Sequence, residues 1–326
     1  MMKALGLLSG GLDSTLAIKL VLESGVEVEA VNFVTPFGQA RKDGWGAPEV
    51  AKSFNIPLKI VQTGADYLRM VRNPRHGYGK NINPCIDCKI FMLKKAKKYA
   101  KEIDAKFIFT GEVLGQRPMS QHREALDLIE KEAGLKGKLV RPLSAKLLPR
   151  TEAEEKGYIN NLGLRDLSGR SRKPQIEMTK EFKIAKYQCA SGGCLLTEAD
   201  FAEKLRDLFE HKKKVTNQDI ALLKVGRHFR SGQNKIIVGR NEAENNALLN
   251  TKLKADFYFE VPKCGSPTTL LQGPKTKTAI RTAAGLTAFH SDKRVGDVAV
   301  KFGKETLDKE IVVTVPSISE VNSIRI

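Results

Sequence analysis

The sequence predicts an α/β fold: a doubly wound parallel sheet followed by a smaller α+β domain. Three observations indicate this. Through the first 150 residues, apolar strand-like runs alternate with helical segments, and the first strand leads through a glycine-rich turn into a helix. After about residue 214 the strands follow one another more closely. Alternating strands and helices form parallel sheets whose ligands bind at the carboxyl ends of the strands.

The first strand, residues 4–8, runs into the turn SGGLDS at 9–14 and then into a helix. Such a turn directs several backbone N–H groups and a helix N-terminus at one place, which suits a phosphate group. The Ser9 and Ser14 hydroxyls add donors, while the Asp13 carboxylate suits Mg²⁺ held against the phosphates. The residues expected to contact a nucleotide here are Ser9, Gly10, Gly11, Leu12, Asp13 and Ser14.

The string SGGLDS resembles the signature of the PP-loop ATP pyrophosphatases, which cleave ATP between the α- and β-phosphates to adenylate a substrate. The resemblance implies a PP-loop or HUP-like sheet, with ATP and Mg²⁺ as ligands and Asp13 as a catalytic residue. The string has neither the glycine-lysine pattern of a P-loop nor the three-glycine pattern of a dinucleotide fold. An ordinary glycine-rich strand-to-helix turn is the alternative.

The next strands are expected at residues 26–34 and 58–63, with a helix at 48–54 between them. Asn32 and Phe33 lie at the end of the strand expected at 26–34, beside the expected switch point of the sheet. They are candidates to line an adenine pocket, and equally they are candidates for ordinary strand residues.

A fourth strand, residues 106–110, ends in the string GEVLGQRPMSQ at 111–121, and a fifth is expected at 139–144. The string is similar to the second nucleotide motif of the tRNA 4-thiouridine synthases, but here it carries the insert Arg117-Pro118-Met119. Gly111 would let backbone approach the nucleotide, and Gln116 would supply an amide to phosphate or base. Arg117 is a candidate contact to RNA or phosphate, or a solvated charge.

Cys85 and Cys88 form a C-x-x-C pair before a helix expected at 90–103, a place where thiolates are favoured. Cys194 follows in a glycine-rich turn, beside Cys189. Two interpretations compete. Either Cys85, Cys88 and Cys194 hold a [4Fe-4S] cluster with one open iron, or one cysteine carries a persulfide that another resolves. Zinc is a third option, with Cys189, His76 or His122 as the fourth ligand.

We expect three segments: a PP-loop nucleotide-binding domain at 1–150, a basic linker and helical extension at 151–214 that carries Cys189 and Cys194, and a last domain at 215–326. The boundary is expected near residues 211–216. The last segment resembles the RNA-binding module of the NFACT ribosome-quality-control proteins, although Cys264 stands where that module has a histidine and is interpreted as structural. The expected phosphate-facing stripe is Arg227, Arg230, Lys235 and Arg240.

The composition favours a polyanionic partner. Of 326 residues, 55 are Lys or Arg and 37 are Asp or Glu, a formal net charge of +18 at pH 7. This excess is typical of RNA-binding proteins, although a solvated basic surface has the same composition. With no long apolar span in the sequence and a C-x-x-C among five cysteines, we expect a cytoplasmic protein without a membrane partner.

Together the resemblances imply an ATP-dependent tRNA sulfurtransferase that adenylates a uridine carbonyl and replaces its oxygen with sulfur, with 4-thiouridine favoured over 2-thiouridine. Its partners would be tRNA and a sulfur donor, either sulfide or a cysteine desulfurase. One alternative is an RNA-modifying enzyme of the same type that uses an amine nucleophile. Another is a non-catalytic RNA-binding protein that retains the nucleotide domain. The sequence leaves the oligomeric state open.

Overall fold

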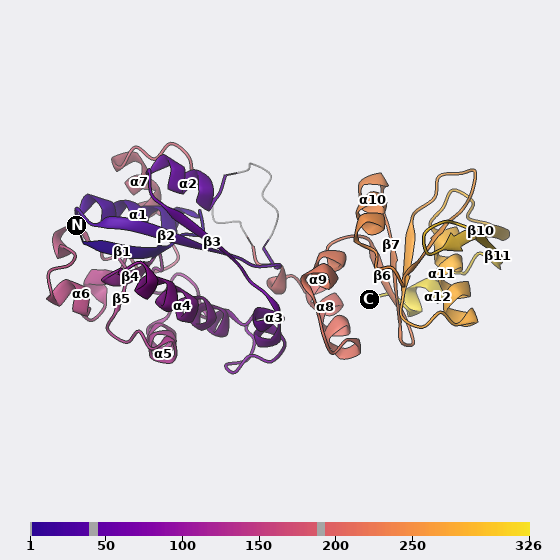
Figure 1. Cartoon of the computed structure of the whole chain (residues 1–326), viewed down its shortest axis with the longest axis horizontal. Helices are drawn as coiled ribbons and strands as arrows, with labels where there is room; N and C mark the ends of the chain where they lie inside the picture. The colour runs from indigo at the N-terminus through magenta and orange to yellow at the C-terminus, as the bar shows by residue number, and fades with distance from the viewer. Residues whose placement is uncertain (1, 39–44, 188–192) are drawn as a thin grey trace. The chain divides into compact units, whose positions relative to one another are not determined.

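The structure, a computed structural model, describes residues 2–38, 45–187 and 193–326. The chain divides into two compact units, Met1–Thr197 and Glu198–Ile326. Figure 1 shows the helices and strands of both units.

The first unit contains a five-stranded parallel sheet, as the sequence predicts. The strands are β1 Lys3–Leu7, β2 Glu27–Val34, β3 Leu58–Gln62, β4 Phe107–Thr110 and β5 Leu139–Val140. Their order is β3-β2-β1-β4-β5, so the chain continues from β1 to one side and later returns to the other side of β1 at β4. The carboxyl ends of β1 and β4 are therefore neighbours, and this is the switch point where ligands bind such sheets.

Helices cover both faces of this sheet (Figure 1). The helices of the described part of this unit are α1 Leu12–Glu23, α2 Ala47–Ser53, α3 Ala65–Arg72, α4 Cys85–Glu102, α5 Arg123–Ala133, α6 Glu152–Glu155 and α7 Lys173–Glu181. Because side chains alternate along a strand, Ala4 and Phe107 belong to the core under α1 and α2, while Leu5 and Ile108 belong to the core under α4 and α5.

The fifth strand is shorter than the expected 139–144. Only Leu139 and Val140 pair with β4, because Pro142 cannot donate to a sheet. The carbonyl oxygens of Pro142 and Leu143 instead accept from the N–H groups of Arg165 and Leu167, at 2.9 and 2.8 Å.

The segment 151–197 is part of the first unit and is not a linker. Its residue Gly169 donates from N–H to the Leu114 carbonyl at 2.8 Å, in the loop after β4. Its helix α7 packs on α1, where Met178 shares a core with Leu12 and Leu16. Three short 3-10 turns, η1 Ala145–Leu147, η2 Asn161–Gly163 and η3 Leu195–Thr197, complete the described part of this unit.

The second unit begins at Glu198, earlier than the expected boundary near 211–216. Its first helix, α8 Ala199–His211, is tied to the sheet that follows, because Asp207 forms ion pairs with Arg230 and Lys235. The sheet is antiparallel, in the order β11-β10-β8-β9-β7-β6. The strands are β6 Arg227–Ser231, β7 Asn234–Val238, β8 Phe257–Glu260, β9 Thr269–Gln272, β10 Asp297–Gly303 and β11 Lys309–Thr314.

Besides a smaller cluster around Leu222 and Leu248, the core of the second unit lies between this sheet and α11 Lys277–Phe289. Its alanine-rich face, including Ala279, Ala283 and Ala284, packs against Phe259 and Val300 of the sheet. The other helices are α9 Asn217–Leu223, α10 Glu242–Thr251 and α12 Ile318–Ser323. Across the described residues of both units, no helix combines the length and apolar character needed to cross a bilayer.

Candidate functional site

The turn between β1 and α1 is held in place by its own serines. The Ser14 hydroxyl donates to the Gly11 carbonyl at 2.9 Å, accepts from the Ser9 N–H at 3.2 Å and pairs with the Ser9 hydroxyl at 3.0 Å. Gly10 has a φ of +79°, and a Cβ there would lie 2.5 Å from the backbone of Gly46 and Ala47. The turn is therefore fixed in shape and needs glycine at position 10.

The loop after β4 approaches this turn closely. A Cβ on Gly111 would lie 2.5 Å from the Ser14 Cα and from the Asp13 carbonyl carbon. Gly111 therefore makes its close approach to the start of α1, and the expected approach of a nucleotide stays a prediction. Any larger residue would push the second motif away from the first.

Asp13 accepts hydrogen bonds from two side-chain amides. Gln116 donates from Nε2 to Asp13 Oδ2 at 2.7 Å, and Gln175 donates from Nε2 to Gln116 Oε1 at 2.8 Å and to Asp13 Oδ1 at a longer 3.4 Å. Gln175 comes from α7 and is 1% exposed. Sequence reasoning missed it because its segment is dense in charge and looked like a solvated arm, and no local motif marks it.

Three other expected nucleotide residues have defined places. Asn32 donates from Nδ2 to the Leu8 carbonyl at 2.7 Å, so it fastens the end of β2 to the start of the turn. Leu12 is buried in the core shared by α1 and α7, and Phe33 packs on the core under α4 and α5. Leu12 therefore offers a ligand its backbone, since its side chain is occupied in packing.

Backbone pairing holds Cys194 near the carboxyl end of β2 in the first unit. The Leu195 N–H donates to the Phe37 carbonyl at 3.0 Å, just after β2, and Gly38 forms a bridge with Cys194. On the other side, the Ile82 N–H donates to the Leu196 carbonyl at 3.2 Å, just before α4. Cys194 is thereby held between the loop after β2 and the start of the cysteine-bearing helix.

Cys85 and Cys88 are the first and fourth residues of α4. Cys85 donates from Sγ to Asn83 Oδ1 at 3.1 Å, and the Cys88 Sγ lies 3.1 Å from the hydroxyl of Tyr67, which is buried in α3. Cys264 lies elsewhere and packs against the second unit's core, in keeping with the structural role expected for it.

The ionisation of these thiols differs from the expectation. Burial raises the pKa of Cys85, although Lys89, Arg117 and the Asn83 hydrogen bond each lower it in part. Burial raises the pKa of Cys88 to about 12, and the charges of Cys194 and Cys85 add to that effect. The helix N-terminus does not outweigh burial for Cys85 and Cys88, so the pKa of each of these two thiols lies above the ordinary cysteine value. The pKa of Cys88 is raised in part by the charges of Cys194 and Cys85, so both of those thiols lie within electrostatic range of Cys88.

Among the described residues, no three His, Cys, Asp or Glu side chains are arranged to hold a single metal ion. His122 accepts from the Ala125 N–H at the start of α5 through Nδ1, at 3.4 Å. Cys189 lies outside the described residues. A [4Fe-4S] cluster binds each thiolate to a different iron and so does not require the sulfurs to meet at one atom, as a zinc site does.

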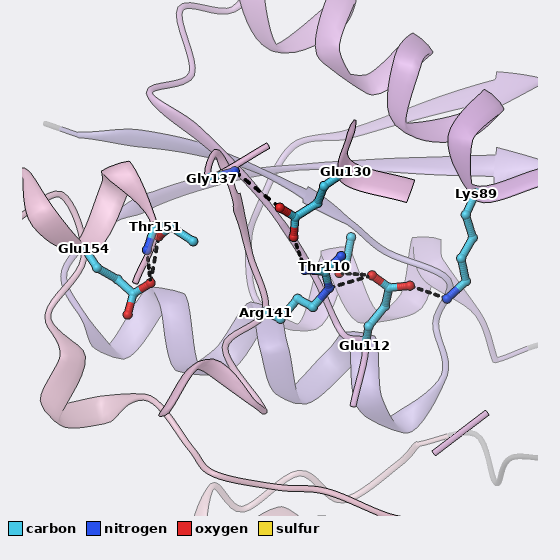
Figure 2. Close-up of polar contacts among 8 residues, drawn as sticks. All are labelled: Lys89, Thr110, Glu112, Glu130, Gly137, Arg141, Thr151 and Glu154. Carbon is cyan, nitrogen blue, oxygen red and sulfur yellow. Dashed lines mark hydrogen bonds and ion pairs between the residues drawn. The ribbon is translucent and has the colours of Figure 1, made fainter. Parts of the chain in front are cut away.

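A buried group of charges joins the cysteine helix to the second motif (Figure 2). Lys89 of α4 forms an ion pair with Glu112, which also accepts from Arg141 Nε at 3.0 Å and from the Thr110 hydroxyl at 3.1 Å. Arg141, 3% exposed, pairs with Glu130 as well. Burial alone would raise the pKa of Glu112, but Lys89 and Arg141 outweigh it and lower the pKa to about 2.

The expected basic stripe of the second unit divides into two pairs. Arg230 and Lys235 bind Asp207, with Arg230 Nη2 at 2.6 Å and Lys235 Nζ at 2.7 Å from Oδ2. Burial lowers the pKa of Lys235 to about 8, although Asp207 acts in the opposite direction. This pair fastens α8 to the sheet. Arg227 and Arg240 instead line a cavity.

Comparison with known proteins matches the two parts of the chain separately. Residues 1–146 match the family model described as thiamine biosynthesis protein (ThiI), and residues 226–323 match the model described as NFACT protein RNA binding domain. Both matches confirm the resemblances expected from the two stretches of sequence.

The individual matches cover parts of longer proteins. A probable tRNA sulfurtransferase of Thermococcus kodakarensis is 32% identical over 151 residues, which cover 43% of this chain and 36% of that protein. A 4-thiouridine synthetase solved in complex with RNA and ATP is 27% identical, with a TM-score of 0.35 over 56% of this chain and 50% of its own. The U34-tRNA thiolase NcsA of Methanococcus maripaludis, solved with its [4Fe-4S] cluster, is 18% identical, with a TM-score of 0.35 over 64% and 67%. Across the curated relatives, the matched stretch spans about a third of their length.

Proposed function

We propose that the chain is an ATP-dependent tRNA sulfurtransferase. One observation carries this proposal: two consecutive residues connect a nucleotide turn with a group of thiols. Gln116 donates to Asp13 of the turn, and the next residue, Arg117, lies close enough to Cys85 to lower the pKa of its thiol. An activated carbonyl formed at the turn would therefore lie near a source of sulfur.

The nucleotide site would consist of the SGGLDS turn and the loop after β4. The Gly10 N–H and the start of α1 suit the phosphates of ATP, while the Ser9 and Ser14 hydroxyls hold the turn in shape. Asp13 fits Mg²⁺, because the side chains that donate to its two oxygens within the described residues are neutral amides, which leaves lone pairs for a cation. Bound there, Mg²⁺ would offset the charge of the phosphates.

The reaction has two steps. The carbonyl oxygen of a tRNA uridine attacks the α-phosphorus of ATP, and the bond to the β-phosphate oxygen breaks to release pyrophosphate. Sulfide then adds to the activated ring carbon and AMP leaves with the former carbonyl oxygen, so that C=S replaces C=O without oxidation or reduction. N–H groups of the turn stabilise the charge that develops on the phosphates. We favour 4-thiouridine over 2-thiouridine as the product, because the matched string GEVLGQ has its counterpart in the 4-thiouridine synthases.

Cys85, Cys88 and Cys194 would hold a [4Fe-4S] cluster. The fit rests on a Cys88 thiol within electrostatic range of Cys85 and Cys194, with further stabilisation of its sulfur by the Tyr67 hydroxyl. When bound, such a cluster offers an iron without a protein ligand as a place for sulfide. The alternative arrangement, a persulfide on one of these cysteines, would leave the protein free of iron.

The test is a nucleoside analysis by mass spectrometry of tRNA from a deletion strain. We expect one thiouridine to disappear, to return with the wild-type gene, and not to return with Asp13→Asn or Cys194→Ser. Cys264→Ser is the matched control and should restore it. Unchanged thionucleosides would refute the proposed activity. An anaerobic preparation should absorb near 400 nm and contain iron, and an active, colourless, iron-free enzyme would favour the persulfide. The cytoplasm, where tRNA is found and thiols stay reduced, is the proposed compartment.

A further inference from the structure

The second unit contains a cavity of about 840 Å³. Its wall combines the start of α10, the loop at 265–267, the end of α11 and the turn at 292–296. This volume lies in the range of sites that enclose a small ligand. A surface that only follows the backbone of a duplex does not need such a hollow.

Three arginines line the cavity, and the guanidinium group of each uses some of its N–H donors to bind a neighbouring protein group. Arg227 donates from Nη1 to the Gly239 carbonyl at 3.3 Å, and Arg294 donates from Nε to the Ser291 carbonyl at 3.1 Å. Arg240 uses Nε and Nη2 to bind Glu244. The acidic residues Glu242 and Asp292 are also part of the wall, and Asp292 accepts from the Gly265 N–H at 3.1 Å.

Three arginines and two acidic residues line the cavity, and Arg325 adds a further positive charge close to Arg227. Burial lowers the pKa of Arg227, and Arg240 and Arg325 lower it further, against one opposing effect from Glu244. Burial also lowers the pKa of His290 to about 4, and Arg227, Arg325 and Arg294 act in the same direction. Cations that repel one another in a hollow leave a positive potential that an anionic group would offset.

The same wall offers flat apolar surfaces. Phe289 and His290 line it together with Pro267 and Pro316. The two rings meet edge to face, with centroids 4.9 Å apart, and so are braced against each other. Unpaired RNA bases bind by stacking on such rings and on arginine planes, which bases inside a duplex cannot do.

We infer that this cavity binds an unpaired nucleotide of RNA, with its phosphate at Arg227, Arg240 and Arg294 and its base against Phe289 and His290. The inference rests on the proposed function only in taking RNA as the ligand. It gives the second unit the task of selecting RNAs with a single-stranded segment.

The test compares two RNAs with the full-length protein at 150 mM salt by fluorescence anisotropy. One is a blunt hairpin, and the other is the same hairpin with four added unpaired nucleotides. We expect about tenfold tighter binding of the second RNA, in the range that base stacking supplies. Arg294→Ala should abolish most of this preference. Arg281→Ala, which removes an exposed arginine of α11 outside the cavity, should keep it.

Photo-crosslinking gives a second measurement that needs no variant. A 5-iodouridine in the unpaired segment should crosslink to peptides that contain residues 289–296. Equal affinity for the two RNAs, equal loss in both variants, or crosslinks that avoid this cavity would overturn the inference. Thiolation of tRNA by the wild type in the same preparation separates the outcomes, because it tests the proposed function and not the cavity.

Discussion

At the scale of single residues, the site depends on how Asp13 is held. Its carboxylate has no arginine or lysine partner among the described residues and is oriented by the amides of Gln116 and Gln175. An amide orients a carboxylate without neutralising it, so the charge stays available to a cation. Gln175 thus has a positioning role, because it reaches Asp13 both directly and through Gln116.

Gln175→Ala should raise the KM for ATP about tenfold. Losing a hydrogen bond to a charged group costs about 1.5 kcal/mol, and Gln116 still orients Asp13. The matched control is Glu177→Ala, since Glu177 is exposed on the same helix. Steady-state kinetics with saturating tRNA would measure both variants. A fall in kcat at unchanged KM would contradict the positioning role.

Alkylation of Cys85 should be slow at neutral pH. Burial raises the pKa of this thiol above the ordinary cysteine value. The reactive thiolate is therefore scarce at neutral pH and becomes abundant only when the pH exceeds that ordinary value. Lys89→Met removes a charge that lowers this pKa, so it should move the profile to still higher pH. Mass spectrometry of iodoacetamide-treated apoprotein from pH 7 to 10 would follow this, with glutathione as the reference thiol. A Cys85 that reacts faster than glutathione at pH 7 is the opposite outcome.

At the scale of elements, α4 links the two halves of the site. Its first turn carries Cys85 and Cys88, and its Lys89 is paired with Glu112 of the loop after β4. That loop continues to Gln116, which holds Asp13. The ion pair therefore fixes the cysteine helix relative to the nucleotide turn.

Glu112→Gln should lower the free energy of unfolding of the protein by about 3 kcal/mol, because it leaves buried Arg141 and Lys89 short of a counter-charge. Glu132→Gln, in a more exposed pair with Arg75, should cost less than about 1 kcal/mol. Urea unfolding at pH 7 measures both. Similar decreases in the free energy of unfolding of the two variants would contradict the larger contribution expected of the buried ion pairs.

The pH dependence of stability follows from the same group. The pKa of Glu112 is lowered from 4.5 to about 2 in the folded protein, so its contribution is complete above about pH 4.5 and is lost as the pH falls through the folded value. The wild type should therefore lose more stability than Glu112→Gln between pH 5 and pH 3. Urea midpoints that fall equally in the wild type and in Glu112→Gln would contradict the assignment of this pH dependence to Glu112.

The elements were more predictable than the contacts between them. The strands at the start of the chain and the SGGLDS turn follow from local patterns, and the structure confirms four of the five expected strands at nearly their full length. The fifth strand ends at Val140, because Pro142 cannot donate a backbone hydrogen bond to β4. That effect depends on which strand lies beside it, and local sequence does not show this. Gln175 reaches Asp13 from 162 residues away, and no local pattern records that contact.

At the scale of the whole molecule, the chain combines two compact units, Met1–Thr197 and Glu198–Ile326. The match to two family models, at 1–146 and 226–323, follows this division. Charge alone indicated RNA but not where it binds, since Arg230 and Lys235 are used to hold α8. Only the structure distinguishes the two cations that pair with Asp207 from Arg227 and Arg240, which line the cavity.

The proposed function requires that ATP cleavage at the turn between β1 and α1 drives sulfur insertion into tRNA. The most direct measurement incubates the purified full-length protein anaerobically with α-labelled ATP, Mg²⁺, sulfide and unmodified tRNA, and quantifies nucleotide products and thiouridine together. We expect AMP and pyrophosphate to form only with tRNA, in step with one thiouridine per AMP, and neither to form with Asp13→Asn. Release of ADP and phosphate, or AMP without any thiouridine when sulfide is in excess, would contradict it.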